Sequence, residues 1–267
     1  MSPNKFVNTL VVLLVSVIGF TRPEDDSRIV NGQNAEFGQF PYQALLLLEM
    51  PDGRSLCGGS LISDRWVLAA GHCTDDASAV EVRLGLIDRS YTDDGSLVLV
   101  SNDFFEHPDF DRETLKNDIA LIHLPEIVKF TDRISPVELP RGHETYQGRV
   151  AIASGFGRTT TDGKPSSRLN YAVMDVISNT VCTASYPGSI RSTNICSVGR
   201  NRSSTCKGDS GGPLRLEDEN ILIGVASFVN RMAGCDMNYP VGFARVSEYV
   251  DYIREATADK GISITLG

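Results

Sequence analysis

The chain has 267 residues, of which 41% are hydrophobic and 22% are charged. This composition excludes a disordered tail, a collagen triple helix and a coiled coil, and it fits one large all-β domain or two subdomains. Asp and Glu outnumber Lys and Arg by 34 to 25, so the formal net charge is −9 at pH 7. No run of Lys or Arg is present that could replace the counterions of a nucleic acid or bind an anionic membrane, so we expect neither partner.

The first 28 residues differ in character from the rest of the chain. Lys5 provides a positive charge, and the segment Leu10–Phe20 is almost continuously apolar. This segment is too short to span a bilayer, which takes about 20 residues, but it suits a secretory signal sequence. We predict a signal peptide over residues 1–19 and a propeptide over residues 20–28, with a buried strand or a membrane anchor as the alternative. The product is expected to be secreted and extracellular.

All the cysteines follow this segment, at Cys57, Cys73, Cys182, Cys196, Cys206 and Cys235. Disulfides persist in secreted proteins, so six cysteines predict three bridges, although sequence spacing leaves every pairing open. The alternative is a zinc site built from Cys57, His72 and Cys73. Adjacent ligands suit tetrahedral geometry poorly, and no Cys-x-x-Cys pair is present. We expect no bound metal and no other cofactor.

From residue 29 onward, short apolar segments alternate with turns rich in Gly, Asp, Asn and Pro, a pattern that predicts an all-β sandwich or a pair of barrels. The predicted strands, in chain order, are Gln43–Glu49, Trp66–Ala70, Val80–Leu86, Leu97–Ser101, Ile119–Leu124, Val150–Ser154, Tyr171–Ile177 and Ile221–Phe228. Helical periodicity appears only near the end of the chain. There, Ser247 is a candidate N-cap for a helix predicted over Glu248–Ala258.

The most informative string is CKGDSGGPL, which runs from Cys206 to Leu214. A serine hydroxyl is a poor nucleophile by itself and needs a base, an orienting carboxylate and donors for the developing oxyanion. The glycines around Ser210 allow a tight turn that presents backbone amides to a ligand. Considered alone, the string is also compatible with an ordinary turn.

Candidate partners for Ser210 lie earlier in the chain. His72 follows an apolar strand and precedes Cys73, whereas His107, His123 and His143 have no comparable setting and are interpreted as structural or surface residues. Asp118 stands at the start of an apolar strand, where an unpaired charge would cost several kcal/mol if buried, so a hydrogen-bonded partner such as an imidazole is needed. A capping or turn role is the alternative for Asp118.

The segments AAGHC, NDIAL and CKGDSGGPL, which carry His72, Asp118 and Ser210 in that order, resemble three motifs of the chymotrypsin family of serine endopeptidases. RIVNG, CGGSLI and SFV match the same family, and the resemblance covers Ile29–Ile253. It implies an all-β fold of two six-stranded antiparallel β-barrels with a C-terminal α-helix. The serine protease domain would span residues 29–267, with barrel halves at about 29–139 and 140–247.

The resemblance also implies the mechanism established for this family. Ser210 would attack the scissile carbonyl, His72 would transfer the proton, and Asp118 would orient the imidazole and stabilise its charge. The backbone amides of Gly208 and Ser210 would form the oxyanion hole, and Ser227 would brace the Asp118 carboxylate. Family pairing of the cysteines would join Cys57 to Cys73, Cys182 to Cys196 and Cys206 to Cys235.

The string RIVNG implies an activation site. A trypsin-like protease would cut between Arg28 and Ile29, and the new Ile29 amine would pair with Asp209 beside the nucleophile. Such an ion pair exists in only one covalent state of the chain. We therefore expect a zymogen whose propeptide, which contains no cysteine, leaves after cleavage.

The family's pocket positions predict a preference for apolar residues. Ser204 occupies the floor position where trypsin-like members carry Asp, so a substrate Lys or Arg would bury an unpaired charge. Val229 and Val241 occupy wall positions and narrow the slot, and Ser227 completes the predicted pocket. We expect Ala, Val or Leu rather than Phe or Tyr before the scissile bond, as in elastase-like members.

Other positions bear on the biological role. The string YPVGF at Tyr239–Phe243 resembles arthropod digestive and collagen-cleaving members, which favours a digestive or tissue-degrading role, with collagen as a subsidiary hypothesis. Leu86 stands where the family's calcium loop has Glu, so calcium is not expected. Asn201-Arg202-Ser203 is an N-glycosylation sequence.

We expect a monomer whose partners are protein or peptide substrates, an activating trypsin-like protease and protein protease inhibitors. Two alternatives remain. One is a non-catalytic secreted homologue that acts as a binding module, and the other is a regulatory cascade protease. Because His72, Asp118 and Ser210 are all present, the sequence favours an enzyme.

Overall fold

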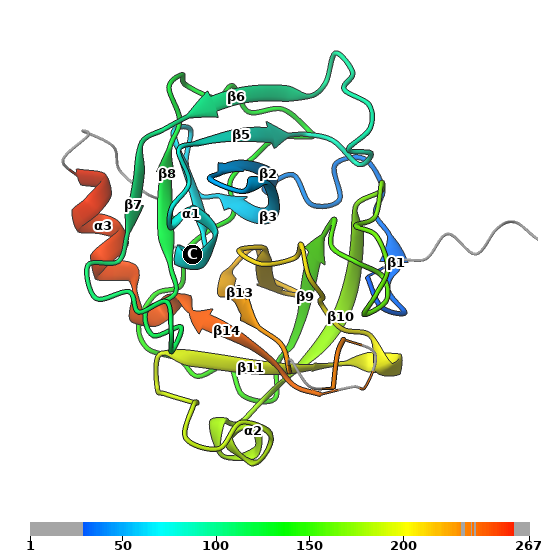
Figure 1. Cartoon of the computed structure of the whole chain (residues 1–267), viewed down its shortest axis with the longest axis vertical. Helices are drawn as coiled ribbons and strands as arrows, with labels where there is room; N and C mark the ends of the chain where they lie inside the picture. The colour runs from blue at the N-terminus through cyan, green and yellow to red at the C-terminus, as the bar shows by residue number, and fades with distance from the viewer. Residues whose placement is uncertain (1–28, 231–232, 236, 238, 259–267) are drawn as a thin grey trace, which may run out of the picture.

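Hydrogen-bonded strands group the chain into two antiparallel sheets, one in the upper and one in the lower half of Figure 1. The computed structural model describes residues 29–230, 233–235, 237 and 239–258. The predicted signal peptide and propeptide lie outside the described residues. Within the described ranges, no helix is long and apolar enough to cross a membrane.

The first sheet has the strand order β6-β5-β2-β3-β4-β8-β7. Residues 102–103 alone separate β6 from β7, so one bent strand pairs with β5 through its first half and with β8 through its second half. The sheet therefore closes into a six-stranded barrel, the first barrel. Its strands are β2 (Gln43–Met50), β3 (Gly53–Leu61), β4 (Trp66–Ala69), β5 (Ala79–Leu84), β6 (Leu97–Ser101), β7 (Phe104–Glu106) and β8 (Ala120–His123).

The second sheet has the order β1-β10-β11-β14-β13-β12-β9, and β9 also pairs with β10. That pairing closes six strands into the second barrel, with β1 added on β10. The predicted fold class, two six-stranded antiparallel barrels with a C-terminal helix, is confirmed. The strands are β1 (Gln33–Asn34), β9 (Val150–Gly155), β10 (Asn170–Ile177), β11 (Asn194–Gly199), β12 (Pro213–Leu216), β13 (Leu222–Phe228) and β14 (Val241–Arg245).

Alternation of apolar and polar residues accounts for the clearest strands. In β5, Val80, Val82 and Leu84 are buried, while Glu81 and Arg83 on the opposite face remain partly exposed and form an ion pair at 2.6 Å. Successive side chains of a strand point to opposite faces, so this sequence can bury only one set. The inward set then packs in the core of the first barrel.

The described residues also form three short α-helices: α1 (Gly71–Thr74), α2 (Asn179–Ser185) and α3 (Val250–Ala258). The predicted capping by Ser247 is wrong. A 3-10 turn over Val246–Glu248 precedes α3 and buries Ser247, whose hydroxyl makes no hydrogen bond with any described residue. Helix α3 lies beside β7 at the left of Figure 1, and Tyr252 donates a hydrogen bond to Phe105 O at 2.6 Å.

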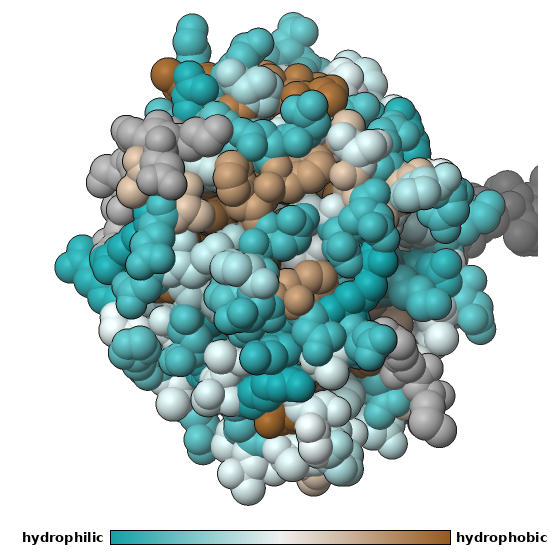
Figure 2. All heavy atoms as spheres, turned by 60° about the vertical axis from the view of Figure 1, so that its left-hand side comes forward, coloured by the Kyte–Doolittle hydropathy of each residue, from teal (hydrophilic) through white to brown (hydrophobic). Residues whose placement is uncertain are grey.

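The surface that carries α3 and β7 faces the viewer in Figure 2. Most of this face is hydrophilic, and hydrophobic side chains gather in smaller areas separated by polar ones. Among the described residues, large exposed apolar side chains are spread over several elements, for example Val100 in β6 and Val181 in α2. Scattered exposure of this kind is normal for a protein surface.

A buried polar contact joins the two barrels. Ser154 of β9 donates its hydroxyl to Gln43 Oε1 of β2 at 2.6 Å, and Gln43 Nε2 donates to Ala44 O at 3.0 Å. Gln43 is 4% exposed and Ser154 is 2% exposed. Because water does not reach this pair, the amide oxygen depends on the serine for its donor.

Replacing Ser154 with Ala is expected to lower the free energy of unfolding by about 1–3 kcal/mol, because Gln43 Oε1 would be left buried without a donor. Equilibrium urea unfolding of the full chain measures this change. The matched control is Ser189→Ala at an exposed position, which should leave the unfolding midpoint unchanged. Equal midpoints for the two variants would show that the contact contributes nothing to stability.

Candidate active site

Antiparallel pairing of β4 with β8 brings His72 and Asp118 together. Ala69, the last residue of β4, pairs with Ala120, the first residue of β8. His72 follows β4 on α1, and Asp118 directly precedes β8. The end of one strand meets the start of its antiparallel neighbour, so residues 46 positions apart in the sequence become neighbours.

The Asp118 carboxylate accepts three hydrogen bonds in a buried position. His72 Nδ1 lies 2.8 Å from Oδ2, the backbone N–H of His72 donates to Oδ1 at 2.9 Å, and Ser227 Oγ donates to Oδ2 at 2.5 Å. Asp118 is 1% exposed. Because an ionised carboxylate only accepts, Nδ1 of His72 carries the proton and Nε2 is left to act as a base.

The loop that precedes β8 fixes the position of Asp118. Leu115 and Asn117 both have φ of +53°, in the left-handed region that non-glycine residues seldom occupy. Asn117 Nδ2 donates to Asp109 O at 3.0 Å, and its Oδ1 accepts from the Tyr249 hydroxyl at 3.3 Å. These contacts hold the strained turn in place, so the carboxylate is presented in one orientation.

Ser210 reaches the site from the second barrel through a close approach of two backbones. The N–H of Gly58 in β3 donates to Ser210 O at 2.7 Å. Gly211 has φ of +77°, and a Cβ there would lie 2.5 Å from Gly58 O. A side chain at position 211 would therefore push the Ser210 turn away from the first barrel.

The turn before Ser210 exposes two backbone amides. The N–H groups of Asp209, Gly211 and Gly212 donate to backbone carbonyls, whereas those of Gly208 and Ser210 have no acceptor among the described residues. Gly208 has φ of +98°, a conformation that glycine adopts without strain. Two unpaired amides on the same turn can accommodate a negatively charged oxygen.

Asp209 is a second buried carboxylate, in a different environment. It is 1% exposed and accepts from the N–H groups of Gly157 at 2.8 Å and Cys206 at 2.9 Å. Burial raises the pKa of Asp209 to about 7, although the two amides oppose the shift. Among the described residues no cation pairs with it. Ile29 is fully buried in the core of the second barrel.

A cavity of about 300 Å³ opens beside His72 and Ser210. Of the predicted pocket residues, Ser227, Val229 and Val241 line it, while Ser204 does not and instead donates its buried hydroxyl to Thr205 O. No described hydrogen bond joins Ser210 directly to His72. The complete lining is His72, Arg112, Leu115, Thr205, Cys206, Lys207, Ser210, Ala226, Ser227, Phe228, Val229 and Val241.

Comparison with known proteins gives the family. The trypsin family model matches residues 29–253. This chain belongs to the trypsin family. The protease is 40% identical to a collagenase of Hypoderma lineatum over 263 residues, which cover 95% of this chain and 98% of that protein. It is also 40% identical to serine protease 1 of Drosophila melanogaster, over 86% of each chain.

A solved structure of the Hypoderma collagenase matches the protease with a TM-score of 0.80 and 41% sequence identity. The match covers 88% of this chain and 100% of that one. Similarity at this level over nearly the whole domain shows a chymotrypsin-like serine endopeptidase, a hydrolase, as the sequence motifs predict. Homologues of this class act on proteins and peptides.

Sequence reasoning missed part of the cavity of the protease. Phe228 follows the predicted Ser227, and Tyr186 packs edge-on against its ring with centroids 5.2 Å apart. Lys207 lies within the CKGDSGGPL string, three residues before Ser210, so the sequence could have indicated that it lies at the cavity. Arg112 belongs to a loop of the first barrel and is held by Asp75 and Asp76 at 2.6 Å each, so only the fold brings it to the cavity.

Disulfides rather than a metal occupy the cysteine positions of the protease. Cys57 bonds to Cys73, Cys182 to Cys196 and Cys206 to Cys235, which is the pairing implied by the family resemblance. The zinc alternative is wrong, because two of its supposed ligands are bonded to each other. In the described part of the chain, no cluster of three His, Cys, Asp or Glu side chains could hold a metal ion.

The raised pKa of Asp209 predicts that the stability of the full chain depends on pH. The pKa of Asp209 in the folded state, about 7, exceeds the ordinary value of 3.8. Its contribution to the free energy of unfolding is therefore greatest at low pH, where Asp209 is protonated in both the folded and the unfolded state. This contribution is lost as the pH rises from about 4 through about 7, by at most about 4 kcal/mol. We expect the free energy of unfolding of Asp209→Asn to fall less steeply with rising pH than that of the parent.

Urea unfolding of uncut protein at several pH values between about 5 and about 8 checks this prediction. The control is Asp162→Asn, at an exposed position, which should retain the parental dependence on pH. Parallel curves for the parent and Asp209→Asn would show that Asp209 is not the group responsible.

Proposed function

We propose that this protease cuts internal peptide bonds through an acyl-enzyme formed on Ser210, with His72 and Asp118 as its catalytic partners. The observation that carries the proposal is the buried Asp118–His72 contact at 2.8 Å beside a cavity that both His72 and Ser210 line. Catalytic hydrogen bonds are often completed only when substrate binds, so a Ser210–His72 bond is required in the complex and not in the free protein.

In the first half of the reaction, Ser210 Oγ attacks the carbonyl carbon and His72 Nε2 takes the hydroxyl proton. The imidazolium that forms is stabilised by Asp118, whose remaining acceptor sites are filled by the His72 amide and Ser227. The carbonyl oxygen becomes an anion, and the backbone amides of Gly208 and Ser210 donate hydrogen bonds to it. His72 then gives its proton to the leaving amine as the C–N bond breaks.

The second half releases the acyl group to water. His72 takes a proton from the water, the resulting hydroxide attacks the ester carbonyl, and the proton returns to Ser210 Oγ as the ester bond breaks. Atoms and charges balance over the cycle, with one water consumed for each peptide bond. Cofactors have no role in these steps.

We also propose that the chain is a secreted zymogen, cut between Arg28 and Ile29. Support comes from Asp209, a buried carboxylate with a raised pKa and two amide donors but no cation among the described residues. An amine created at Ile29, whose side chain is buried in the second barrel, would supply the missing positive charge. Pairing would stabilise the turn that carries Gly208 and Ser210.

An apolar preference before the scissile bond is the third part of the proposal. Val229 and Val241 line the cavity, and none of its lining residues is acidic, so a basic side chain would find no carboxylate there. Small and medium apolar side chains would therefore fit best. Such a slot distinguishes two side chains that differ by one methylene by only about 1–3 kcal/mol, so the preference is expected to be broad.

For the biological role we propose extracellular protein digestion. Native collagen is the subsidiary candidate, because a relative that is 40% identical is named a collagenase. Failure of the processed protease to digest triple-helical collagen, under conditions in which it degrades casein, would remove this candidate. Activation of a single zymogen in place of general protein digestion would instead favour the cascade alternative.

Reactive-serine labelling tests the catalytic proposal. After limited cleavage by trypsin, a fluorophosphonate probe is expected to label the protein at Ser210, because the activated hydroxyl attacks phosphorus. Ser210→Ala should not be labelled, and Arg28→Gln should be secreted but remain unlabelled and inactive. A processed, folded protein that neither labels nor cleaves casein would be the non-catalytic binding module. Full activity of Arg28→Gln would contradict only the zymogen proposal.

Enlarging the pocket tests the specificity. Val229 is half-buried at the cavity wall, so Val229→Gly is expected to raise kcat/KM for Phe relative to Val before the scissile bond by roughly 10- to 200-fold. Profiling both proteins on a peptide library measures the change, and Val181→Gly, at an exposed site in α2, is the control. Parental cleavage mainly after Phe or Tyr would contradict the narrow slot, and cleavage after Arg would contradict the pocket assignment.

A further inference from the structure

A second cavity, of about 260 Å³, lies in the second barrel, and none of its lining residues borders the active-site cavity. Eight of its nine lining residues have a polar side chain, and most of these can donate hydrogen bonds. The lining residues are His143, Thr145, Gln147, Ile177, Ser178, Asn179, Ser192, Arg245 and Glu248. The mechanism proposed above uses none of them, so this cavity needs an explanation of its own.

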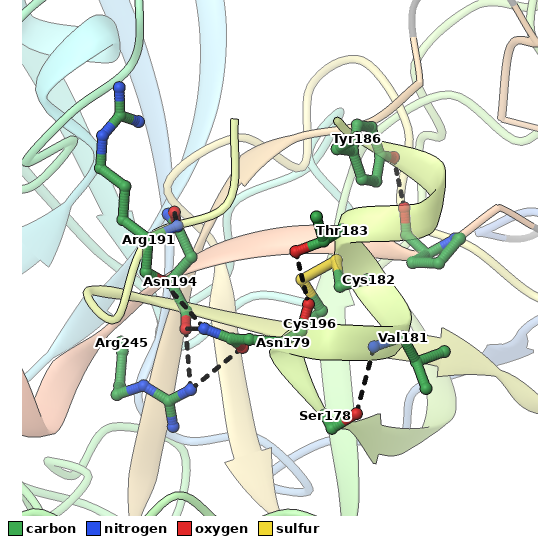
Figure 3. Close-up of a disulfide and its surroundings, with 11 residues drawn as sticks. Ser178, Asn179, Val181, Cys182, Thr183, Tyr186, Arg191, Asn194, Cys196 and Arg245 are labelled. Carbon is green, nitrogen blue, oxygen red and sulfur yellow. Dashed lines mark hydrogen bonds between the residues drawn. A yellow bond between two sulfur atoms is a disulfide. The ribbon is translucent and has the colours of Figure 1, made fainter. Parts of the chain in front are cut away.

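Arg245, the last residue of β14, is the buried cation of this cavity. It is 7% exposed. Its Nη2 donates to Asn194 O at 2.8 Å and to Asn179 Oδ1 at 3.3 Å, its Nε donates to Ser192 O at 3.0 Å, and its Nη1 donates to Thr145 O at 2.8 Å. Figure 3 shows Nη2 facing the two asparagine oxygens, with the other terminal nitrogen pointing away from them.

These contacts satisfy the hydrogen bonds of Arg245 only in part and do not neutralise its charge. A guanidinium has five N–H donors, so four described acceptors leave one hydrogen of Nη1 unused. All four acceptors are neutral oxygens, and no carboxylate of the described residues forms an ion pair with Arg245. Burial lowers the pKa of Arg245, with the charge of Glu248 opposing the shift. An unneutralised buried cation is energetically costly, and a bound anion would offset that cost.

The other lining groups favour an oxyanion. Ser178 Oγ accepts from Val181 N–H at 3.2 Å, so its own hydroxyl hydrogen is available to a ligand. Thr145, Gln147 and Ser192 add donors at the rim. Glu248 is the one carboxylate of the lining; its Oε1 lies 3.3 Å from His143 Nδ1, and it forms no ion pair with Arg245 among the described contacts.

We propose that this cavity, the Arg245 pocket, binds a tetrahedral oxyanion of the sulfate or phosphate type, either as a free ion or as an ester group. The unused Nη1 hydrogen of Arg245 and the surrounding hydroxyls are its ligands. The volume exceeds that of one such ion, which leaves room for the group that an ester carries. Because the chain is acidic overall, affinity comes from these short-range contacts and not from long-range attraction.

The obvious variant, removal of Arg245, would also break four hydrogen bonds that tie together three chain segments, so it could unfold the protein. Ser192→Asp is the better test. Ser192 is exposed at the cavity, and its contact with Arg245 uses the backbone carbonyl, which the substitution retains. The new carboxylate would repel an anion and pair with Arg245 in its place. Ser189→Asp adds the same charge at an exposed position outside the cavity lining and is the matched control.

The experiment titrates the full chain with millimolar sodium sulfate, sodium phosphate or N-acetylglucosamine 6-sulfate, at constant ionic strength kept with sodium chloride, and follows the thermal unfolding midpoint. Saturable stabilisation of the parent and of Ser189→Asp is expected, with the apparent Kd raised at least about ten-fold in Ser192→Asp. If sulfate or phosphate stabilises the protein and the sugar sulfate does not, the site binds a free ion. If the sugar sulfate binds more tightly than the free ions, the site binds an ester group.

Equal, non-saturable stabilisation of all three proteins would be the general effect of excluded salts and would overturn the proposal. Equal saturable binding to the parent and Ser192→Asp would overturn it as well, because the anion would then lie elsewhere. The readout does not depend on catalysis. Loss of fluorophosphonate labelling at Ser210 would contradict the proposed function without affecting this result.

Discussion

The structure depends on one buried carboxylate that accepts hydrogen bonds from both barrels. Asp118 comes from the first barrel, and its Oδ2 accepts from His72 of the same barrel and from Ser227 of β13 in the second. The contact therefore orients the imidazole and joins the two halves of the molecule with the same atoms. The three hydrogen bonds to Asp118 replace those to the water that a buried carboxylate loses. The cavity beside His72 and Ser210 lies where the two barrels meet at this contact.

Asp209 and Asp118 are equally buried, and their neighbours give them different chemistry. Asp118 has an imidazole and a hydroxyl as partners, whereas Asp209 has two backbone amides and a pKa raised to about 7 by burial. A carboxylate in the second situation gains strongly from any cation that reaches it. That difference supports the two roles proposed above, control by cleavage before Ile29 for Asp209 and orientation of the catalytic base for Asp118. Arg245 shows the complementary case, a buried cation that has only neutral acceptors.

Much of the fold could be predicted from local patterns, and the misses have identifiable causes. Every predicted strand is present within a few residues, because each one combines apolar or β-branched residues with a turn signal. Strand β3 was missed because Gly58 and Gly59 interrupt its apolar pattern. A Cβ at Gly58 would meet Gly212 of the second barrel, and a Cβ at Gly59 would meet Val67 of the first. Ser247 fits the residue preference of an N-cap, yet a buried 3-10 turn places the start of α3 beyond it. Packing with distant segments outweighed local preference in each case.

The sequence by itself determined the family, the identity of the candidate triad and the fold class, because these rest on residue types in ordered strings that are recognisable without coordinates. The tertiary structure decided what depends on distances between remote segments. It gave the geometry of two features that the family resemblance implied, the bond from Ser227 to Asp118 and the unpaired amides at Gly208 and Ser210. The presence of Arg112 at the cavity came from the fold alone. The tertiary structure also revealed the Arg245 pocket, which no motif marks. Burial and charge balance arise from neighbours on other strands, and a linear pattern does not record which strands will be neighbours.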